Sequence, residues 1–307
     1  MHSPTVKSLH YGSLFFLFMA QTMGGINIVG AKFLVSTISI PTILVLRFTL
    51  AALFLFILYF MRATPKKMLH EIKRVDRVGW LFIFAQALCA GVLFNFLMLW
   101  GLHSTSANVA GITTSALPAM VAVMAWLFLR EHMSTKIIAC IIFATIGLIL
   151  INLHFDHTMS NNTSLWGGIL VFLSLLPEAA YYVLSKIHRS TLNIFLLSAI
   201  INAINAIILL FFVGYHLPSQ ILQFDFPQLV ALVAISLGSG LFYVFWVAGS
   251  KHVASHTASM SIALMPITTI IIAWLVLAEK ITMLQFAGMC LVILSIVICV
   301  RRSSKSY

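Results

Sequence analysis

Long runs of apolar residues alternate with short polar segments along this chain, and the pattern predicts helices that cross a membrane. A spanning helix needs about 20 consecutive, mostly apolar residues. Ten stretches have this character, with ends defined to about 2–4 residues. They cover residues 11–31, 40–60, 79–100, 105–127, 134–153, 166–186, 191–214, 229–249, 254–277 and 282–300. The expected fold class is an all-α integral membrane protein with ten transmembrane helices.

The composition excludes an ordinary soluble domain. Of the 307 residues, 61% are hydrophobic and only 8% are charged, whereas about a quarter of a soluble domain is charged. Polar groups could not cover the surface of such a fold, so the lipid bilayer must act as its solvent. The net charge of +11 does not indicate nucleic acid, because the basic residues lie in short loops between apolar stretches.

The distribution of lysine and arginine predicts the orientation of the chain. If the N-terminus is cytoplasmic, fifteen of the 18 basic residues fall in cytoplasmic segments, two fall outside, and Arg47 lies within a span. Cytoplasmic loops of membrane proteins carry such an excess of positive charge. Both termini are therefore expected in the cytoplasm.

The chain repeats itself with an offset of 148 residues, without a gap. The matched pairs are Phe94 and Phe242, Gly101 and Gly249, Pro118 and Pro266, Trp126 and Trp274, Leu127 and Leu275, Leu129 and Leu277, and Glu131 and Glu279. Two copies, 11–153 and 166–300, would each hold five spans, and an odd number makes the second copy enter from the opposite side. Inverted repeats are frequent in secondary transporters, where two similar halves exchange conformations. A duplicated scaffold that transports nothing is the alternative.

The repeats resemble the drug/metabolite transporter superfamily, in its ten-helix group built from two EamA-type repeats. The resemblance rests on Gly24-Gly25-Ile26-Asn27 in the first span, on Arg47-Phe48 in the second, and on the segments 126–131 and 274–279. In the family a glycine usually precedes the paired glutamates, and here Arg130 and Ala278 stand instead. The resemblance implies transport of metabolites, amino acids or drugs, often outward, in the inner membrane of bacteria.

Glu178 is the main candidate for a substrate-binding residue. It lies in the middle of the sixth span, directly after Pro177. An unpaired carboxylate in lipid is costly, and ionisable groups in spans are functional by default. Our hypothesis is that Glu178 faces a central cavity and binds a cationic amine or a coupling proton. A structural ion pair with Arg47 or Lys186 is the alternative.

Three further candidates carry weaker signals. Arg47 could bind a carboxylate or phosphate with two hydrogen bonds, or it could cap neighbouring carbonyls. Asn108 and His256 begin matching small and polar faces of the fourth and ninth spans. Close helix packing explains the small residues of these faces but does not require an asparagine or a histidine. Both side chains are therefore candidates for the cavity, and His256 could also titrate near neutral pH.

Four polar or aromatic residues complete the candidate set: Asn27, Trp100, Tyr182 and Tyr243. They lie on the helices that line the cavity in members of the resembled family. Aromatic rings can stack on an amine, although aromatic residues near span ends are more often interfacial anchors. The sequence contains no Walker loop and no cluster with metal spacing. It predicts neither an enzyme nor a resident cofactor or metal.

The leading interpretation is a secondary transporter or exporter of a small polar metabolite, such as an amino acid or an amine, that works by alternating access and is open to proton coupling. Two alternatives remain, a membrane scaffold without transport and a flippase for a lipid-linked substrate. A scaffold should tolerate changes at Glu178 and His256, and a flippase should open sideways to lipid. The sequence leaves open whether the protein is a monomer or a homodimer.

Overall fold

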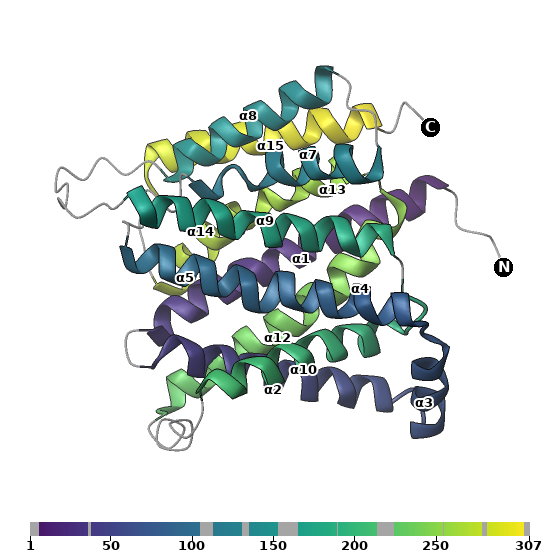
Figure 1. The fold of residues 1–307 in the computed structure, drawn as a ribbon. Helices are drawn as coiled ribbons and strands as arrows, with labels where there is room; N and C mark the ends of the chain where they lie inside the picture. Colours follow the sequence, from purple (N-terminus) through teal and green to yellow (C-terminus); the bar gives the residue numbers. More distant parts are fainter. Residues whose placement is uncertain are drawn as a thin grey trace. The chain divides into compact units, whose positions relative to one another are not determined.

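The computed structural model describes residues 6–35, 38–104, 113–130, 135–152, 165–188, 190–213, 224–253, 255–277 and 281–303. All regular elements in these ranges are helices (Figure 1). In chain order they are α1 (Val6–Val35), α2 (Ile40–Phe60), α3 (Pro65–Arg74), α4 (Arg77–Ala87), the π-helix η1 (Leu88–Leu93), α5 (Phe94–Ser104), α7 (Leu117–Leu129), α8 (Thr135–Asn152), α9 (Leu165–Ile187), α10 (Ile194–Val213), α12 (Phe226–Gly249), the 3-10 helix η3 (Ser250–His252), α13 (Ser255–Ile262), α14 (Leu264–Leu277) and α15 (Met283–Ser303).

Seven helical stretches in the described ranges are long and apolar enough to cross a membrane. They are Tyr11–Ala31, Ile40–Phe60, Arg77–Met98, Trp166–Ile187, Ile194–Phe211, Phe226–Gly249 and Thr257–Val276. Each overlaps one of the spans expected from the sequence. Three shorter apolar helices, Leu117–Leu129, Thr135–Ile151 and Met283–Ile298, lie at the remaining three. The all-helical membrane fold is thus confirmed for this part of the chain, whereas the number of ten crossings stays a prediction.

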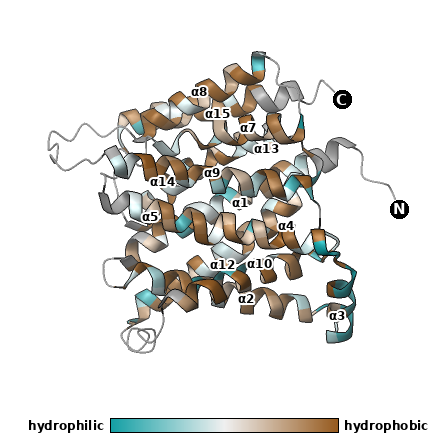
Figure 2. Ribbon diagram, viewed as in Figure 1, coloured by the Kyte–Doolittle hydropathy of each residue, from teal (hydrophilic) through white to brown (hydrophobic). Residues whose placement is uncertain are grey.

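Figure 2 shows apolar residues along most of the helices, with α3 as a clearly hydrophilic exception. Polar caps mark where several helices begin. Asp76 accepts a hydrogen bond from the backbone N–H of Gly79 at 2.9 Å and starts α4. Asp225 and Gln228 bond to each other's backbone N–H groups and form a capping box that starts α12. Such caps satisfy N–H groups that a helix leaves without a partner in its first turn.

The chain forms two compact units, and each unit takes helices from both sequence halves. Unit 1 comprises Met1–Val92 and His188–Lys251, and unit 2 comprises Leu93–Ile187 and His252–Tyr307. Within unit 1, α1 packs on α12, and α2 packs on both α10 and α12. Within unit 2, α5 packs on α9, α8 on α15, and α7 on both α9 and α13. Helices of the first half therefore pack mainly on helices of the second.

A close backbone approach occurs in each unit at a repeat-related glycine, and the two contacts are alike. In unit 1, a methyl group added at Gly249 would lie 2.8 Å from the backbone N of Leu17 and 2.9 Å from the carbonyl O of Ser13. In unit 2, a methyl group at Gly101 would lie 2.8 Å from the backbone N of Val171 and 2.9 Å from the carbonyl O of Gly167. Only glycine allows two helices to approach this closely. Repeat-related glycines therefore make the same contact twice.

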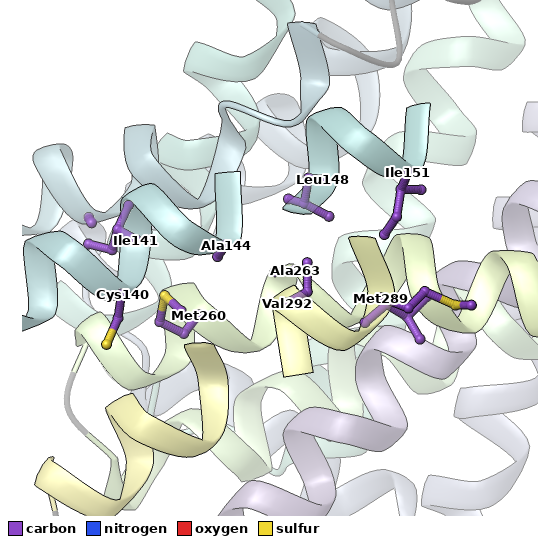
Figure 3. Close-up of a cluster of buried hydrophobic side chains, with 11 residues drawn as sticks. Cys140, Ile141, Ala144, Leu148, Ile151, Met260, Ala263, Met289 and Val292 are labelled. Atoms are coloured by element: carbon purple, nitrogen blue, oxygen red, sulfur yellow. The ribbon is translucent and has the colours of Figure 1, made fainter. Parts of the chain in front are cut away.

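The core of unit 2 contains the contact between α8 and α15. Gly147 and Gly288 face each other across it, and a methyl group on either would lie within 3 Å of the other's carbonyl oxygen. Around this contact, buried apolar side chains of α7, α8, α13, α14 and α15 form one cluster (Figure 3). Its buried members are Ala122, Cys140, Ile141, Ala144, Leu148, Ile151, Met260, Ala263, Ile267, Met289 and Val292.

Arg130 ends α7 in an unusual backbone conformation. Its φ of 52° and ψ of 29° place it in the left-handed region. This is the position after a helix at which glycine is usual, because a Cβ atom raises the energy of that conformation. The structure thus gives a physical reason for the glycine that the resembled family carries before its paired glutamate.

Candidate functional site

Two helices of unit 2 are interrupted at repeat-related prolines. The helix that holds Pro118 is broken by a turn at Ser115 and Ala116, and α7 begins at Leu117. The helix that holds Pro266 is broken at Ala263, between α13 and α14. Proline has no N–H group to give to the carbonyl four residues earlier. At both breaks a backbone N–H donates to the carbonyl three residues earlier instead of four. The N–H of Ala116 donates to the carbonyl O of Thr113, and the N–H of Ala263 donates to the carbonyl O of Met260.

Such interruptions at corresponding places in two halves indicate a binding site. In transporters, broken helices expose backbone N–H and carbonyl groups near the middle of the membrane, where they can bind polar substrates and ions. Here α7 and α13 contact each other, and both also contact α9. Ala116, at the N-cap of α7, makes no side-chain cap hydrogen bond. The three helices α7, α9 and α13 therefore form the candidate site of unit 2.

Glu178 lies on α9, the helix that contacts both α7 and α13. It is the fourteenth of the 23 residues of α9 and follows Pro177, and its side chain is half-buried. In the part of the chain that the structure describes, the carboxylate has neither a hydrogen bond nor an ion pair. A carboxylate in such a place is costly unless a cation or a proton accompanies it.

Lys186 was one of the two partners considered for Glu178 in a structural ion pair. Its Nζ instead donates a 2.6 Å hydrogen bond to the carbonyl O of Val253, directly before α13. Lysine at the end of a helix commonly satisfies a carbonyl in this way. The lysine therefore ties α9 to the start of α13. Arg47, the other partner considered, belongs to unit 1.

Other candidates of unit 2 differ widely in their surroundings. Tyr182, one turn after Glu178 on α9, is buried, and its ring centroid lies 5.3 Å from that of Tyr181. Trp100, on α5, is 59% exposed and lies against Phe96, a position that suits a contact with lipid. The backbone of His256 is part of α13, next to Thr257, whose hydroxyl is buried without a hydrogen bond among the described residues. Asn108 lies outside the described residues.

Unit 1 holds Arg47, Asn27 and Tyr243. The guanidinium of Arg47 lies 4.5 Å above the ring of Phe48, and its Nε is buried without a hydrogen bond among the described residues. Tyr243, buried on α12, is close enough to interact electrostatically with Arg47. The Nδ2 atom of Asn27 donates to the carbonyl O of Met23 at 3.1 Å. The structure thus brings Arg47 and Tyr243 together, and it gives Asn27 a bond within its own helix.

A polar face on α10 lies outside the eight candidate residues from the sequence, although Asn202 is a polar residue within an expected span. Asn202 donates to the carbonyl O of Ser198 at 2.8 Å and accepts a 3.3 Å bond from the Ser239 hydroxyl. Asn205, one turn further, is fully buried, and neither atom of its amide has a hydrogen-bond partner among the described residues. Its side chain lies against Gly91, inside the π-helix η1. π-Helical turns within α-helices are frequent at functional sites.

Asn205 allows a direct test of whether this face serves function or stability. A buried amide without partners lowers stability, and an apolar side chain of the same shape removes that cost. We expect Asn205→Leu to stabilise the fold by about 1–3 kcal/mol and to lower transport. Thermal unfolding of the purified protein and flux in proteoliposomes would measure both effects. A loss of stability of this size would show that the amide is well bonded in the folded protein.

No metal centre is indicated in the described ranges, where no three His, Cys, Asp or Glu side chains are grouped so that they could hold an ion. The candidate residues described in the two units instead carry amide, hydroxyl, guanidinium, carboxylate and aromatic groups. Groups of this kind bind and release a polar molecule through hydrogen bonds and charge. Their chemistry is that of a binding site.

Comparison with known proteins agrees with this chemistry. YetK, an uncharacterized transporter of Bacillus subtilis (strain 168), is 24% identical over 304 residues, which are 96% of this chain and 88% of the relative. YyaM, an uncharacterized transporter of the same organism, is 26% identical over 271 residues, which are 87% of this chain and 86% of the relative.

One solved structure, described only as the crystal structure of a protein, has the same fold as this chain. It superposes with a TM-score of 0.77 over 96% of this chain and 99% of that chain, at 13% identity. The EamA-like transporter family matches the sequence twice, over residues 11–153 and 165–301. The chain therefore belongs to the EamA-like transporter family of the drug/metabolite transporter superfamily, and it is a multi-pass membrane protein with a transporter role.

Proposed function

We infer that this transporter is a secondary carrier for a small metabolite with an amino group, such as an amino acid or an amine, and that it works by alternating access. In this proposal ten spans form two inverted five-helix repeats, 11–153 and 166–300. The membrane is the inner membrane of a bacterium, and both termini lie in the cytoplasm. The excess of lysine and arginine in the segments on one side supports this orientation.

The paired structural features support the inverted repeat. Gly101 and Gly249 are 148 residues apart and make the same backbone contact in different units. Pro118 and Pro266 have the same offset, and each follows a break in its helix. Related halves with opposite orientation can exchange conformations and expose one site to either side in turn.

The observation that carries the proposal is the carboxylate of Glu178, which has no partner among the described residues and lies on the helix that contacts both broken helices. An ammonium group would give this carboxylate a charge-assisted hydrogen bond. The N-terminus of α7, capped only by Ala116, offers backbone N–H groups to an anion. A zwitterion would satisfy both ends of such a site, and an amine would satisfy Glu178 alone. This complementarity favours amino acids and amines over purely anionic metabolites.

Flux into proteoliposomes tests the proposal. The purified protein would be reconstituted and offered a panel of radiolabelled amino acids, amines, sugars and carboxylic acids, with and without a pH gradient. We expect saturable flux of at least one compound with an amino group, and none of the acids that lack one. A membrane scaffold would carry nothing, and a flippase would move only lipid-linked compounds. Either result, or flux restricted to acids, would contradict the proposal.

A further inference from the structure

The helix α3 differs from every other helix described in this protein, because none of its residues is buried. It begins at Pro65, where the backbone N–H of Lys67 donates to the Thr64 hydroxyl at 3.3 Å. It ends before Asp76, which starts α4. The helix therefore forms a separate short segment between two membrane spans, and its polar character is visible in Figure 2.

The outer face of α3 is basic. Lys66, Lys67, Lys73 and Arg74 are all exposed, and Arg62 and Arg77 extend the charge at both ends. Leu69 is 51% exposed on the same face, three residues after Lys66 and four before Lys73, so the three share one side of the helix. An apolar tip between lysines is typical of a helix that lies in the headgroup region, with the lysine stems reaching toward the phosphates.

The single acidic residue of α3, Glu71, lies at the edge of this face, one turn after Lys67. Glu71 is half-buried, and its Oε2 accepts a 3.0 Å hydrogen bond from the backbone N–H of Asn193. Asn193 in turn starts α10, because its side chain accepts a bond from the N–H of Phe195 at 2.9 Å. The carboxylate therefore connects α3 with α10, and the other charged side chains of α3 are all basic.

We propose that α3 is a lipid-sensing element, a basic helix in the membrane surface that binds anionic phospholipid headgroups and transmits their presence to α10 through Glu71. The charge of the outer face selects for anionic over zwitterionic lipid, because basic residues close to such a surface gain electrostatic energy from it. The bond from Asn193 to Glu71 makes the start of α10 the first place to respond. This inference does not depend on which substrate the carrier moves.

Hydrogen exchange of the full-length protein in nanodiscs tests the lipid contact. Discs of phosphatidylcholine would be compared with discs that also contain phosphatidylglycerol. We expect phosphatidylglycerol to slow exchange of the α3 amides about tenfold, and this effect to be lost in the variant K66Q/K67Q/K73Q/R74Q. The matched control, K136Q/K251Q/R301Q/R302Q, removes the same charge elsewhere and should keep it. Equal exchange in both lipids, or a response that survives in the α3 variant, would overturn the proposal.

The connection to α10 has its own readout. In the wild type, phosphatidylglycerol should also slow exchange of the Asn193 amide, which donates to Glu71. Glu71→Ala should leave the α3 response intact and abolish the response at Asn193, whereas His70→Ala, an exposed neighbour on the same helix, should change neither. If Asn193 still responds in Glu71→Ala, the connection through Glu71 is wrong. These measurements need no transport activity, so their failure is distinguishable from failure of the proposed function.

Discussion

Glu178→Gln is expected to abolish most of the transport of an amino-group substrate while the protein remains folded. Glutamine has nearly the same shape as glutamate and removes only the negative charge. A hydrogen bond between charged groups contributes about 1.5–3 kcal/mol, so its loss corresponds to a rise of about ten- to hundredfold in the half-saturation constant. Flux of the substrate identified in proteoliposomes, measured over a range of concentrations, would give this number.

The same variant separates the two roles considered for Glu178. If the carboxylate binds an ammonium group, Glu178→Gln weakens binding in both net flux and exchange between the two sides. If it carries a coupling proton, glutamine imitates the protonated form permanently. Exchange then continues, but a pH gradient no longer drives accumulation. Parallel assays of exchange and of gradient-driven uptake distinguish the two results.

A control for the change of charge is available in the same chain. Glu279→Gln removes one carboxylate from the end of a span, where the sequence predicts no substrate contact. This variant should transport at the wild-type rate. Wild-type transport by Glu178→Gln at every pH tested would show that the carboxylate is structural. That result would leave the membership of the family untouched.

The arrangement of apolar segments could be predicted from the sequence because lipid imposes it directly. Backbone polar groups that face lipid must be paired within the protein, and a helix pairs them within itself, so long apolar segments locate most of the spans. The seven long helices all overlap expected spans. The repeat-related glycines were also identified from the sequence, although their contacts with Ser13, Leu17, Gly167 and Val171 were not. A contact between distant helices leaves no periodic signal in either of them.

The apolar pattern does not predict the helix breaks or the π-helix. The spacing of residues in the two repeats does give a weaker indication of the π-helix. Asp76 and Asp225 are the N-caps of the corresponding helices α4 and α12, and Phe94 and Phe242 are matched residues of the two repeats. The interval from Asp76 to Phe94 is one residue longer than the interval from Asp225 to Phe242. A π turn holds one more residue than an α turn, so η1 can absorb the extra residue. Comparison of cap positions in the two repeats would have located the irregularity.

The partners of the candidate residues were the least predictable part. Lys186 and Glu178 lie two turns apart on one helix, which made an ion pair reasonable. In the structure Lys186 instead donates a hydrogen bond to the backbone carbonyl of Val253, 67 residues further along the chain. Asn205 is not among the candidates from the sequence, because an asparagine in an apolar span can equally serve packing. Only the fold shows that it is fully buried against Gly91.

Gly288→Ala is expected to destabilise unit 2 strongly, although it adds only one methyl group. The added Cβ would lie 2.6 Å from the carbonyl O of Gly147 and 3.0 Å from the backbone N of Ile151. These are backbone atoms within a helix and cannot rotate away, so α8 and α15 must separate. Overpacking of this kind costs about 1–3 kcal/mol, occasionally more. Thermal unfolding of the purified protein in detergent would measure the loss.

Gly12→Ala supplies the matched control. Gly12 also lies in a helix, α1, but no described atom outside its own neighbourhood lies within 4 Å of the added methyl. Alanine there should stabilise the protein by about 0.5–1 kcal/mol, because it has the lower entropy cost in a helix. Opposite signs for the same substitution would tie the effect at Gly288 to the contact of two helices. An equal effect at both glycines would mean that helix propensity decides, and that α8 and α15 are not in backbone contact.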